Sequence, residues 1–378
     1  MVITNGKCVA CGACISACPQ KCITMIEGER GFWIPQIDSE ACIQCKRCQM
    51  VCPVNSRPKG VSWEEGDYFA IWANDTEQRK EGSSGGVFGL LADEVLEKGG
   101  IVYGAAYSKN CKYVYQTNTD QVSLQQLKKS KYVESYTGDV FSNVKSQLEK
   151  GRNVLFCGTS CQIDGLVSYL NREYDNLLTC DFLCHGVPAA SVFRKYIESL
   201  EARYGMVTHV DFRSKTYGWK TYCSKVEFAS GNTYLRTKLL DPYLRSFFED
   251  FVLRDACYEC RRLHHSNADI TLGDWWRVTN YPEVPDTDEG ISLVGIHTMK
   301  GWEQIKQIIA DRKCVSKHLE RSQYEYAYQM TRNMPPQRET ELLKILSLDD
   351  LFSIPVPLNT LIHGVAYHLK ALIKTKLK

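Results

Sequence analysis

The stretch CVACGACISACP, residues 8–19, returns later in the chain as CIQCKRCQMVCP, residues 42–53. In both stretches three cysteines are separated from one another by two residues, and a fourth follows after three more residues and precedes a proline. Each cysteine of the second stretch lies 34 positions after its counterpart in the first (42 − 8 = 34). Residues 8–53 therefore contain an internal duplication of a four-cysteine motif.

This duplicated motif is typical of a pair of 4Fe-4S clusters. Three closely spaced cysteines bind one cluster. The fourth cysteine, which follows a short helix, binds the other cluster. A zinc site needs only four ligands and a disulfide framework suits a small secreted domain, so both explain the eight cysteines less well. Residues 1–58 thus resemble a bacterial two-cluster ferredoxin. The predicted ligands are Cys8, Cys11, Cys14 and Cys52 for the first cluster, and Cys18, Cys42, Cys45 and Cys48 for the second.

The composition excludes several broad classes of protein. A length of 378 residues is enough for roughly two or three domains. The net charge of +2 gives no general attraction to nucleic acid or to acidic partners. No apolar run reaches the roughly 18 residues of a transmembrane helix. The start, MVITNGKC, does not resemble a secretory signal although the chain has 18 cysteines. We therefore predict a cytoplasmic protein whose cysteines hold cofactors rather than disulfides.

We predict an α/β fold, α+β overall, in four segments: the two-cluster domain over 1–58, a linker over 59–67, an α/β domain over 68–320 and a helical tail over 321–378. Strands that alternate with helices favour parallel βαβ units. An antiparallel meander is expected over 207–237, with a turn at Gly231-Asn232. The hairpin expected between the two cysteine motifs covers 23–38. The other expected strands are 68–73, 101–107, 153–157, 177–183, 268–276 and 291–298, and the expected helices are 87–98, 139–151, 189–204, 241–253 and 300–311.

Four further cysteines occupy chemically suggestive places in the predicted α/β domain. Cys161 follows one strand and opens a helix, and Cys184 ends the next strand. If those strands are neighbours, both thiols lie at the carboxyl edge of a parallel sheet, where open α/β folds bind ligands. Cys257 and Cys260 add a chelating pair. Spacing alone leaves a third 4Fe-4S cluster, a zinc site and four unrelated core cysteines all open, whereas Cys22, Cys157 and Cys180 are expected in the core.

The order of several motifs resembles the coenzyme F420 hydrogenase/dehydrogenase beta-subunit family over roughly residues 68–312. The motifs are SSGG (83–86), FCGTSCQIDGL (156–166), DFLCHGVP (181–188), VDFRSKTYGWK (210–220), CYEC (257–260) and ADITLGDWW (268–276). The resemblance implies an FAD-binding α/β domain with its own 4Fe-4S cluster near the flavin, held by Cys161, Cys184, Cys257 and Cys260. Relatives usually have proline where this chain has Ser160, which loosens the turn before Cys161.

Two strand-to-helix turns are candidates for the flavin phosphates, because backbone N–H groups at a helix N-terminus bind such anions. The first turn is Ser83-Ser84-Gly85-Gly86, for which a plain helix cap is an equally good reading. The second is Gly158-Thr159-Ser160 with Gln162 behind it. No GxGxxG fingerprint is present, so an ordinary Rossmann site is not expected.

Several single residues complete the predicted site. Lys215 and Lys220 are expected at the flavin edge or its phosphates, with an exposed strand end as the alternative. His185 is the candidate proton relay, or else a structural hydrogen-bonding residue. Trp275 and Trp276 are expected in the core rather than stacked on the flavin.

The segment LNTLIHGVAYHLKALIKTKLK, residues 358–378, forms an apolar stripe flanked by lysines. Such a helix docks on an anionic membrane or a partner, or packs on its own domain, which we favour.

A flavin accepts a hydride and releases single electrons, which iron–sulfur clusters carry. We therefore expect an oxidoreductase that passes electrons between 4Fe-4S clusters and a hydride carrier or a small unsaturated substrate through FAD. Its expected partner is a ferredoxin or another redox protein. The alternatives are an electron-transfer subunit with no substrate of its own, and a non-catalytic iron–sulfur or zinc scaffold.

Overall fold

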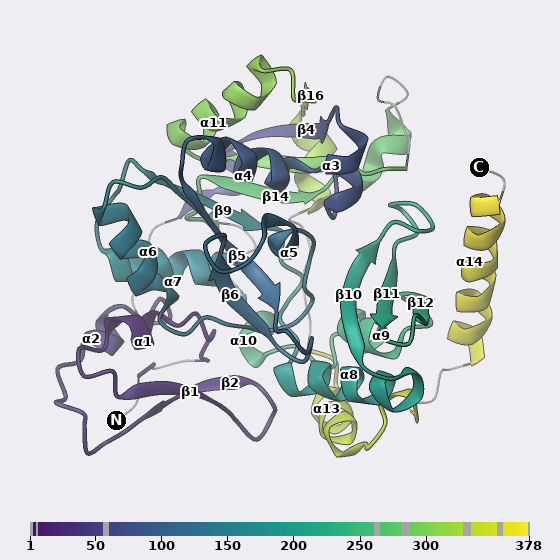
Figure 1. The fold of residues 1–378 in the computed structure, drawn as a ribbon, viewed down its shortest axis with the longest axis horizontal. Helices are drawn as coiled ribbons and strands as arrows, with labels where there is room; N and C mark the ends of the chain where they lie inside the picture. Colours follow the sequence, from purple (N-terminus) through teal and green to yellow (C-terminus); the bar gives the residue numbers. More distant parts are fainter. Residues whose placement is uncertain are drawn as a thin grey trace.

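The protein was analysed as a computed structural model, which describes residues 3–4, 7–55, 60–260, 265–281, 284, 288–327, 334–353 and 358–376. Residues 7–55, called the head below, lie at the lower left of Figure 1, beneath the helices of the larger α/β region. The head contains α1 (Ala13–Ala17), β1 (Ile23–Glu27), β2 (Trp33–Ile37) and α2 (Arg47–Met50). β1 and β2 form the predicted antiparallel hairpin.

The larger region is built on a nine-stranded mixed sheet, which confirms the expected α/β class. β5, β8, β9 and β14 are parallel neighbours, and β15 is antiparallel to both β14 and β4. β4 therefore runs in the same direction as the parallel strands. The order is β16 (Cys314–His318), β4 (Asp67–Ala73), β15 (Ser292–Ile296), β14 (Ile270–Asp274), β9 (Leu177–Phe182), β8 (Val154–Cys157), β5 (Ile101–Tyr107), β6 (Val114–Asn118) and β7 (Ser135–Tyr136).

Helices cover the two faces of this sheet, because successive strand residues point to opposite sides. Val102 and Leu155 point to one face and pack beneath α4 (Val87–Glu97) and α11 (Met299–Ala310). Tyr103 and Phe156 point to the other face, beneath α6 (Val140–Glu149) and α7 (Ser160–Leu170). Cys11 and Ala13 of the head join this second core. The head is thus packed onto the sheet through α6 and α7.

A separate three-stranded antiparallel sheet confirms the predicted meander. It consists of β10 (Val207–Ser214), β11 (Cys223–Phe228) and β12 (Thr233–Thr237). This sheet shares one apolar core with α8 (Ala190–Tyr204), α9 (Pro242–Phe248) and α13 (Arg338–Ser347). In Figure 1 it lies to the right of the nine-stranded sheet, with α14 (Leu358–Lys376) beyond it. The α/β region therefore has two lobes, and the head contacts both: Cys11 and Ala13 join the core under the large sheet, and Phe32 of the hairpin joins the core of the second lobe.

Several sequence-based expectations need correction. The region is not built from parallel units alone, since β4 and β14 flank an antiparallel β15 and β5 pairs with an antiparallel β6. Between the expected strand 68–73 and the expected helix 87–98, the structure adds α3 (Thr76–Glu81), which begins because the Asp75 carboxylate accepts the Glu77 N–H at 2.8 Å. The helix expected over 241–253 ends at Phe248, and β6, β7 and β16 were not predicted.

The predicted linker and tail both pack against the rest. β3 (Val61–Ser62) pairs with β13 (His265–Ser266), and Trp63 is 3% exposed. In the tail, α12 (Arg321–Tyr324), α13 and α14 are helical as expected. Positions 56–59 of the predicted first domain and linker, and 377–378 of the tail, lie outside the described residues. None of the helices in the described ranges is both long and apolar enough to cross a membrane.

Candidate functional site

One group of head sulfurs, which we call the proximal set, faces the large region and consists of Cys8, Cys11, Cys14 and Cys52. The turn that carries the first three is compact because Gly12 adopts φ 83 and the Ala10 N–H donates to the Cys8 Sγ at 3.3 Å. Burial raises the pKa of the Cys14 thiol to about 12, and the nearby Cys8 and Cys52 add to that rise. The structure therefore brings together the cysteines predicted to share one cluster.

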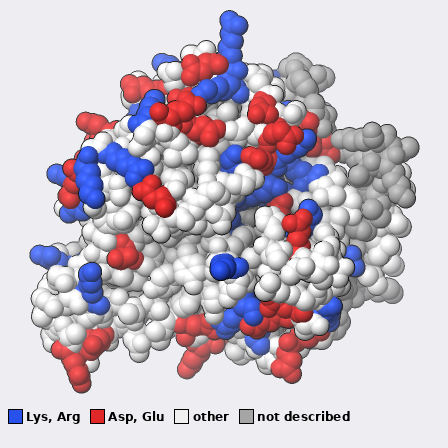
Figure 2. Space-filling model, in the orientation of Figure 1, with Lys and Arg blue, Asp and Glu red and all other residues white. Residues whose placement is uncertain are grey.

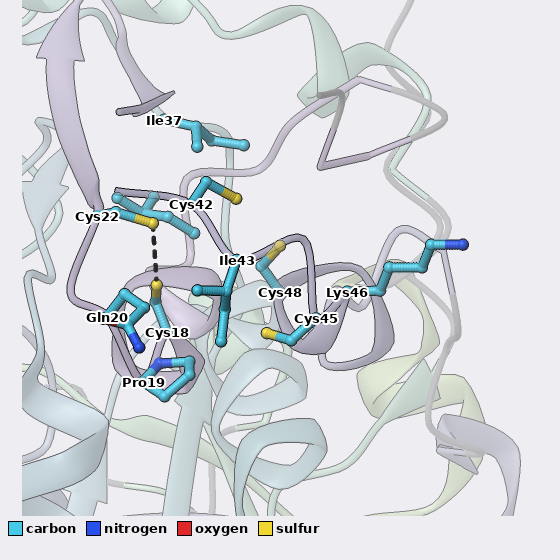
Figure 3. A pocket seen from close by; sticks show the side chains of 11 residues that line it. Cys18, Pro19, Gln20, Cys22, Ile37, Cys42, Ile43, Cys45, Lys46 and Cys48 are labelled. Carbon is cyan, nitrogen blue, oxygen red and sulfur yellow. Dashed lines mark hydrogen bonds between the residues drawn. The ribbon is translucent and has the colours of Figure 1, made fainter. Parts of the chain in front are cut away.

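The distal set, Cys18, Cys42, Cys45 and Cys48, lines a cavity on the outer side of the head (Figure 3). Ile23, Ile37 and Ile43 form apolar parts of the same wall. Cys45 is exposed, whereas Cys48 is 7% exposed. The cavity also contains the buried Cys22, whose Sγ lies 3.4 Å from the Cys18 Sγ. Cys22, predicted as core, is buried and also faces the place where the second cluster was predicted.

The cysteines of the edge set, Cys161, Cys184, Cys257 and Cys260, belong to the large region. β8 and β9 are adjacent and parallel, so Cys161 and Cys184 follow the carboxyl ends of neighbouring strands, as predicted. Cys257 lies in α10 (Asp255–Tyr258). Burial raises the pKa of its thiol to about 12, and Cys161 and Cys260 add to the rise. Cys161 and Cys260 are therefore both near Cys257, and Cys184 follows the strand next to the one that precedes Cys161. In the described part of the chain, no group of three or more His, Cys, Asp or Glu side chains is arranged so that it could hold a single metal ion.

The proximal and edge sets meet across α7. Cys161 lies in the first turn of this helix, and Gly165 follows one turn later. A Cβ at Gly165 would lie 2.8 Å from the Cys11 Sγ, so the glycine allows the head to approach closely. Cys161 is also among the charges that raise the pKa of Cys11, although burial is the larger cause. The two sulfur sets are thus neighbours although 150 positions separate these cysteines (161 − 11 = 150).

A buried arginine joins the same two parts. The Arg254 guanidinium donates to the Cys8 carbonyl at 3.2 Å and to the Trp33 carbonyl at 2.8 Å. It also pairs with Glu134, and both side chains are more than nine-tenths buried. The Arg254 carbonyl accepts the Cys257 N–H at 2.8 Å. One residue therefore contacts a proximal cysteine, the head hairpin and an edge cysteine, and no local sequence pattern pointed to it.

Exposed ion pairs hold the segment around Cys257 and Cys260 against the head. Lys7, which precedes Cys8, pairs with Glu259 at 2.6 Å, and Arg30 pairs with Asp255 at 2.6 Å. Such surface pairs each contribute little to stability. They nevertheless show that the loop carrying two edge cysteines faces the head along its length.

The predicted phosphate turn Ser83-Ser84-Gly85-Gly86 packs tightly at the carboxyl end of β4. A Cβ at Gly85 would lie 2.3 Å from the Ile71 carbonyl oxygen, and Gly86 adopts φ 89, so both positions require glycine. The Ser84 hydroxyl donates to the Ile291 carbonyl at 2.7 Å, and the Ser83 Oγ accepts the Ser130 N–H at 2.8 Å. The serine hydroxyls thus hold the turn, and α4 begins at Gly86 without a side-chain cap.

The two predicted lysines have different surroundings. The Lys215 Nζ donates to the backbone carbonyls of Ser84 at 2.7 Å, Glu289 at 2.6 Å and Arg79. Burial, followed by the charges of Arg213 and Lys129, lowers the pKa of Lys215 to about 7. Lys215 therefore acts on this turn by binding its backbone and by its charge. Lys220 lies farther along the same loop, with its N–H bound to the Asp288 carboxylate at 2.8 Å.

Sequence reasoning missed the residue at the centre of this region, Arg213. Its guanidinium forms two bonds to the Asp274 carboxylate, at 2.8 and 2.9 Å, and donates to the Ser83 carbonyl at 2.8 Å. It lies 4.3 Å from the Tyr222 ring centroid. Trp276, which is 38% exposed, stacks on Trp219 at 4.5 Å. The only sequence signal for Arg213 was its position between Phe212 and Ser214 in the motif FRSK.

We call the region between the lobes, where Arg213, Lys215, Tyr222 and Trp276 meet the Ser83–Gly86 turn, the basic cleft. Figure 2 shows a hollow with gathered Lys and Arg side chains on the right half of the drawn face, between the parts that contain the two sheets. Trp275 is fully buried, as expected, whereas the core prediction for Trp276 was wrong, because its ring is 38% exposed.

The second predicted turn is a helix start. Thr159 caps α7, and the Gln162 Oε1 accepts the Thr159 N–H at 3.0 Å. The Gln162 amide also donates to the hydroxyls of Ser135 at 3.0 Å and Thr137 at 3.2 Å. Gln162 is thus held by the protein itself, and Gly158 allows it to fold back, since a Cβ there would lie 2.9 Å from its Oε1. The buried Ser160, in place of the usual proline, bonds with the buried Asp181, where burial raises the carboxyl pKa to about 6.

His185, the candidate proton relay, is half-buried beside the edge set. Its Nε2 lies 2.8 Å from the Asp250 Oδ1, and its ring meets Phe247 edge to face at 4.8 Å. Asp250 itself adopts φ 61. The carboxylate therefore orients the imidazole one residue after Cys184, a geometry that suits either role considered from the sequence.

Comparisons with known proteins fall on the same two parts. Residues 151–322 match the family described as the C terminus of the coenzyme F420 hydrogenase/dehydrogenase beta subunit. Residues 7–56 match the 4Fe-4S dicluster domain. An uncharacterized protein of the rpl9-rpl11 intergenic region in Porphyra purpurea is 39% identical over 56 residues, which are 14% of this chain and 71% of that protein.

Ketoisovalerate oxidoreductase subunit VorC of Methanothermobacter marburgensis is also 39% identical, over 54 residues that make up 14% of this chain and 68% of that subunit. Among solved structures, a chain of the F420-reducing NiFe hydrogenase complex from Methanosarcina barkeri superimposes with a TM-score of 0.46 and 18% identity. The match covers 77% of this chain and 90% of that one.

Proposed function

The chain belongs to the coenzyme F420 hydrogenase/dehydrogenase beta-subunit family and carries a 4Fe-4S dicluster head, and from this premise we propose a flavin-linked electron conduit. The two family matches together already indicate a role in iron–sulfur electron transfer. The proposal adds that electrons pass between the distal and proximal clusters, a third cluster at the edge set, and FAD in the basic cleft. A hydride carrier or a small unsaturated molecule exchanges a hydride there.

One observation carries the proposal: the candidate centres follow one edge of the large sheet in order. The carboxyl ends of β4, β14, β9 and β8 share this edge, because β4 runs in the same direction as the three parallel strands. Across it lie the Ser83–Gly86 turn, Asp274, Cys184 and Cys161. The head then begins on the other side of α7. The order along the edge is therefore cleft, edge set, proximal set and distal set.

The cysteine sets fit the clusters proposed for them. A 4Fe-4S cluster takes one thiolate on each iron, so its ligands come from around a cavity rather than converge on one point. In the distal set, sulfurs from both cysteine motifs line one cavity. In the proximal set, Cys52 of the second motif is near Cys8 and Cys14 of the first. This crossing of the two motifs supports the ligand exchange predicted for a two-cluster head.

The basic cleft fits an anionic flavin dinucleotide. Arg213 and Lys129 are close enough to Lys215 to lower its pKa, and this crowding of cations favours a bound anion. The N-terminus of the eleven-residue helix α4 is held at the cleft by Lys215 and lacks a side-chain cap. When bound, the flavin supplies two-electron hydride chemistry and one-electron release. The chain positions it through Arg213, the Ser83–Gly86 backbone and the Trp276 face.

Cofactor analysis of the full chain, purified without oxygen, tests the proposal. We expect about twelve iron atoms for three 4Fe-4S clusters, against about eight for the head alone, together with one flavin per chain. Cys257→Ser should remove about four of those iron atoms and leave the two head clusters. The matched control is Cys314→Ser, a 7% exposed cysteine in β16 that is remote from the edge set. About eight iron atoms and no flavin in the unchanged chain would contradict the proposal.

A second candidate function is an electron-transfer subunit that has no substrate of its own. The apolar side chains that α14 presents to solvent favour it, since Ile362 and Ile373 are 59% and 58% exposed. Hydride oxidation by the isolated chain distinguishes the two functions. Turnover without a partner supports the oxidoreductase, whereas flavin reduction that depends on a second protein supports the subunit.

A further inference from the structure

The outer surface of the head combines an exposed sulfur set with unpaired positive charge. The two segments that carry the distal cysteines, residues 16–26 and 41–50, contain Lys21, Lys46 and Arg47 and no Asp or Glu. All three cations are exposed. In the described part of the chain none of them forms a salt bridge, whereas Lys7, Arg30 and Arg194 elsewhere on or near the head are paired. These two segments therefore place three unpaired cations next to the distal set.

Two large exposed apolar side chains belong to the second of these segments. Ile43, next to Cys42, is 61% exposed, and Met50, at the end of α2, is 65% exposed. Ile43 also forms part of the wall of the distal cavity (Figure 3). Exposed apolar residues beside a redox centre, ringed by charge, are suited to a small and transient protein contact. Of the adjacent acids, Glu27 pairs with Arg194, whereas Asp38 and Glu40 are exposed, so three cations against two acids leave one surplus positive charge beside the distal set.

We propose that this face, formed by Lys21, Ile43, Lys46, Arg47 and Met50, is the docking site of a small acidic one-electron carrier protein. The inference rests on the proposed conduit, because it makes the distal cluster the point where electrons enter or leave. Charge complementarity selects the occupant, since an acidic carrier is steered by the unpaired cations and a basic one is repelled. The exposed Cys45 places a cluster ligand directly under the contact.

Each encounter transfers a single electron. A reduced carrier cluster loses one electron and the distal 4Fe-4S cluster gains it, or the reverse, with no bond formed and no proton required. The apolar pair Ile43 and Met50 excludes water from the contact, while the three cations raise the encounter rate. Electrostatically steered association is accelerated by about 10- to 1000-fold and is lost as salt rises.

The test uses the full chain with its clusters and the double variant Lys46→Asn, Arg47→Glu. Lys46 has φ 62, which Asn tolerates well, and Arg47 begins α2, where Glu is favourable. The matched control is Lys306→Glu, Arg312→Asn, which makes the same charge change at an exposed site on and after α11, with Arg312 at φ 55. Stopped-flow measurements follow electron exchange with a purified acidic two-cluster ferredoxin and with a basic cytochrome.

At low salt we expect the head variant to slow exchange with the acidic ferredoxin by about tenfold, within the range of steering effects. The control should match the unchanged chain, the difference should vanish at high salt, and exchange with the basic cytochrome should not slow. Redox titration of the distal cluster should give the same potential in all three proteins. An equal loss in the control, or a loss that persists at high salt, would overturn the docking site. A wrong conduit proposal would give a different result: the head would exchange electrons with the ferredoxin at the normal rate, but no flavin would become reduced.

Discussion

The proximal and distal sulfur sets share one cysteine pattern and differ in what surrounds them. The proximal set lies against α7 and Arg254 and contributes Cys11, 7% exposed, to the core of the large region. The distal set opens toward solvent, with Cys45 exposed and Ile43 and Met50 beside it. The repeat therefore supplies two equivalent sets of cysteines, and the rest of the chain makes one inward-facing and the other outward-facing.

This difference predicts a direct path for electrons through the head, between its outer surface and the large region. In the proposed conduit, electrons reach the large region through the proximal side, because Cys161 of the edge set and Cys11 of the proximal set are neighbours. The proposed exchange with other proteins takes place on the distal side, where apolar side chains and unpaired cations are exposed. Burial and hydrogen bonds to sulfur also tune cluster potential. Two clusters with the same ligands are therefore expected to differ in potential.

The largest expected effect comes from removing one ligand from each set. Cys11→Ser should lower the rate of electron passage from an external carrier to the flavin by more than about 100-fold, since even outer-shell partners are worth 10- to 100-fold in metal affinity. Cys45→Ser should lower exchange with the carrier equally. It should, however, leave the proximal signal in electron paramagnetic resonance and the passage from flavin to proximal cluster intact. Equal damage to both clusters by both variants would contradict the inward–outward division.

The next effect concerns the buried contact behind the proximal set. Arg254→Met leaves Glu134 as an uncompensated buried carboxylate and should lower the free energy of unfolding by about 3–5 kcal/mol. Adding Glu134→Leu should recover much of that loss, because both charges are then absent. Arg30→Gln, which removes an exposed pair with Asp255, is the control and should cost less than about 1 kcal/mol. Denaturant unfolding under argon gives these values, and no recovery in the double variant would exclude the ion pair as the cause.

The head could be predicted almost completely from the sequence, because its ligands lie in two short local motifs. The crossing of Cys18 and Cys52 between the sets follows from that motif alone. The edge set was predictable for a different reason: Cys161 and Cys184 each follow the carboxyl end of a recognisable strand, and adjacent parallel strands bring their carboxyl ends together. Most of the candidate cysteines could therefore be predicted because they lie in short sequence motifs or directly after a predicted strand.

Arg213, Arg254 and Glu134 were not predictable, because each is a single charged residue whose partner lies far away in the sequence. Asp274 is 61 positions from Arg213, and Glu134 is 120 positions from Arg254. The strands β6, β7 and β16 of the large sheet were missed for a related reason. β16 pairs with β4 across most of the chain, and its sequence, CVSKH, has too few apolar residues to indicate a buried strand.

A smaller effect tests how closely the head must approach the edge set. Gly165→Ala places a methyl group 2.8 Å from the Cys11 Sγ and should cost about 1–3 kcal/mol, as overpacking does. The added volume should also slow transfer between the proximal cluster and the edge set, which flash photolysis can follow. Gly104→Ala is the control, because its Cβ would meet Leu127 at an ordinary 3.5 Å. Equal effects of the two changes would show that closeness at Gly165 has no special role.

The smallest expected effect is at α14, which lies across the molecule from the head in Figure 1. Its inner side packs on the rest: a Cβ at Gly364 would meet the Leu240 side chain at 2.7 Å, and the Tyr367 hydroxyl donates to the Lys220 carbonyl at 3.1 Å. Ile362→Asp with Ile373→Asp changes only exposed positions. It should alter stability by less than about 0.5 kcal/mol and leave cluster reduction unchanged. If the apolar stripe binds lipid, the same change should abolish co-sedimentation with anionic vesicles. Vesicle binding that survives both aspartates would remove α14 from that role.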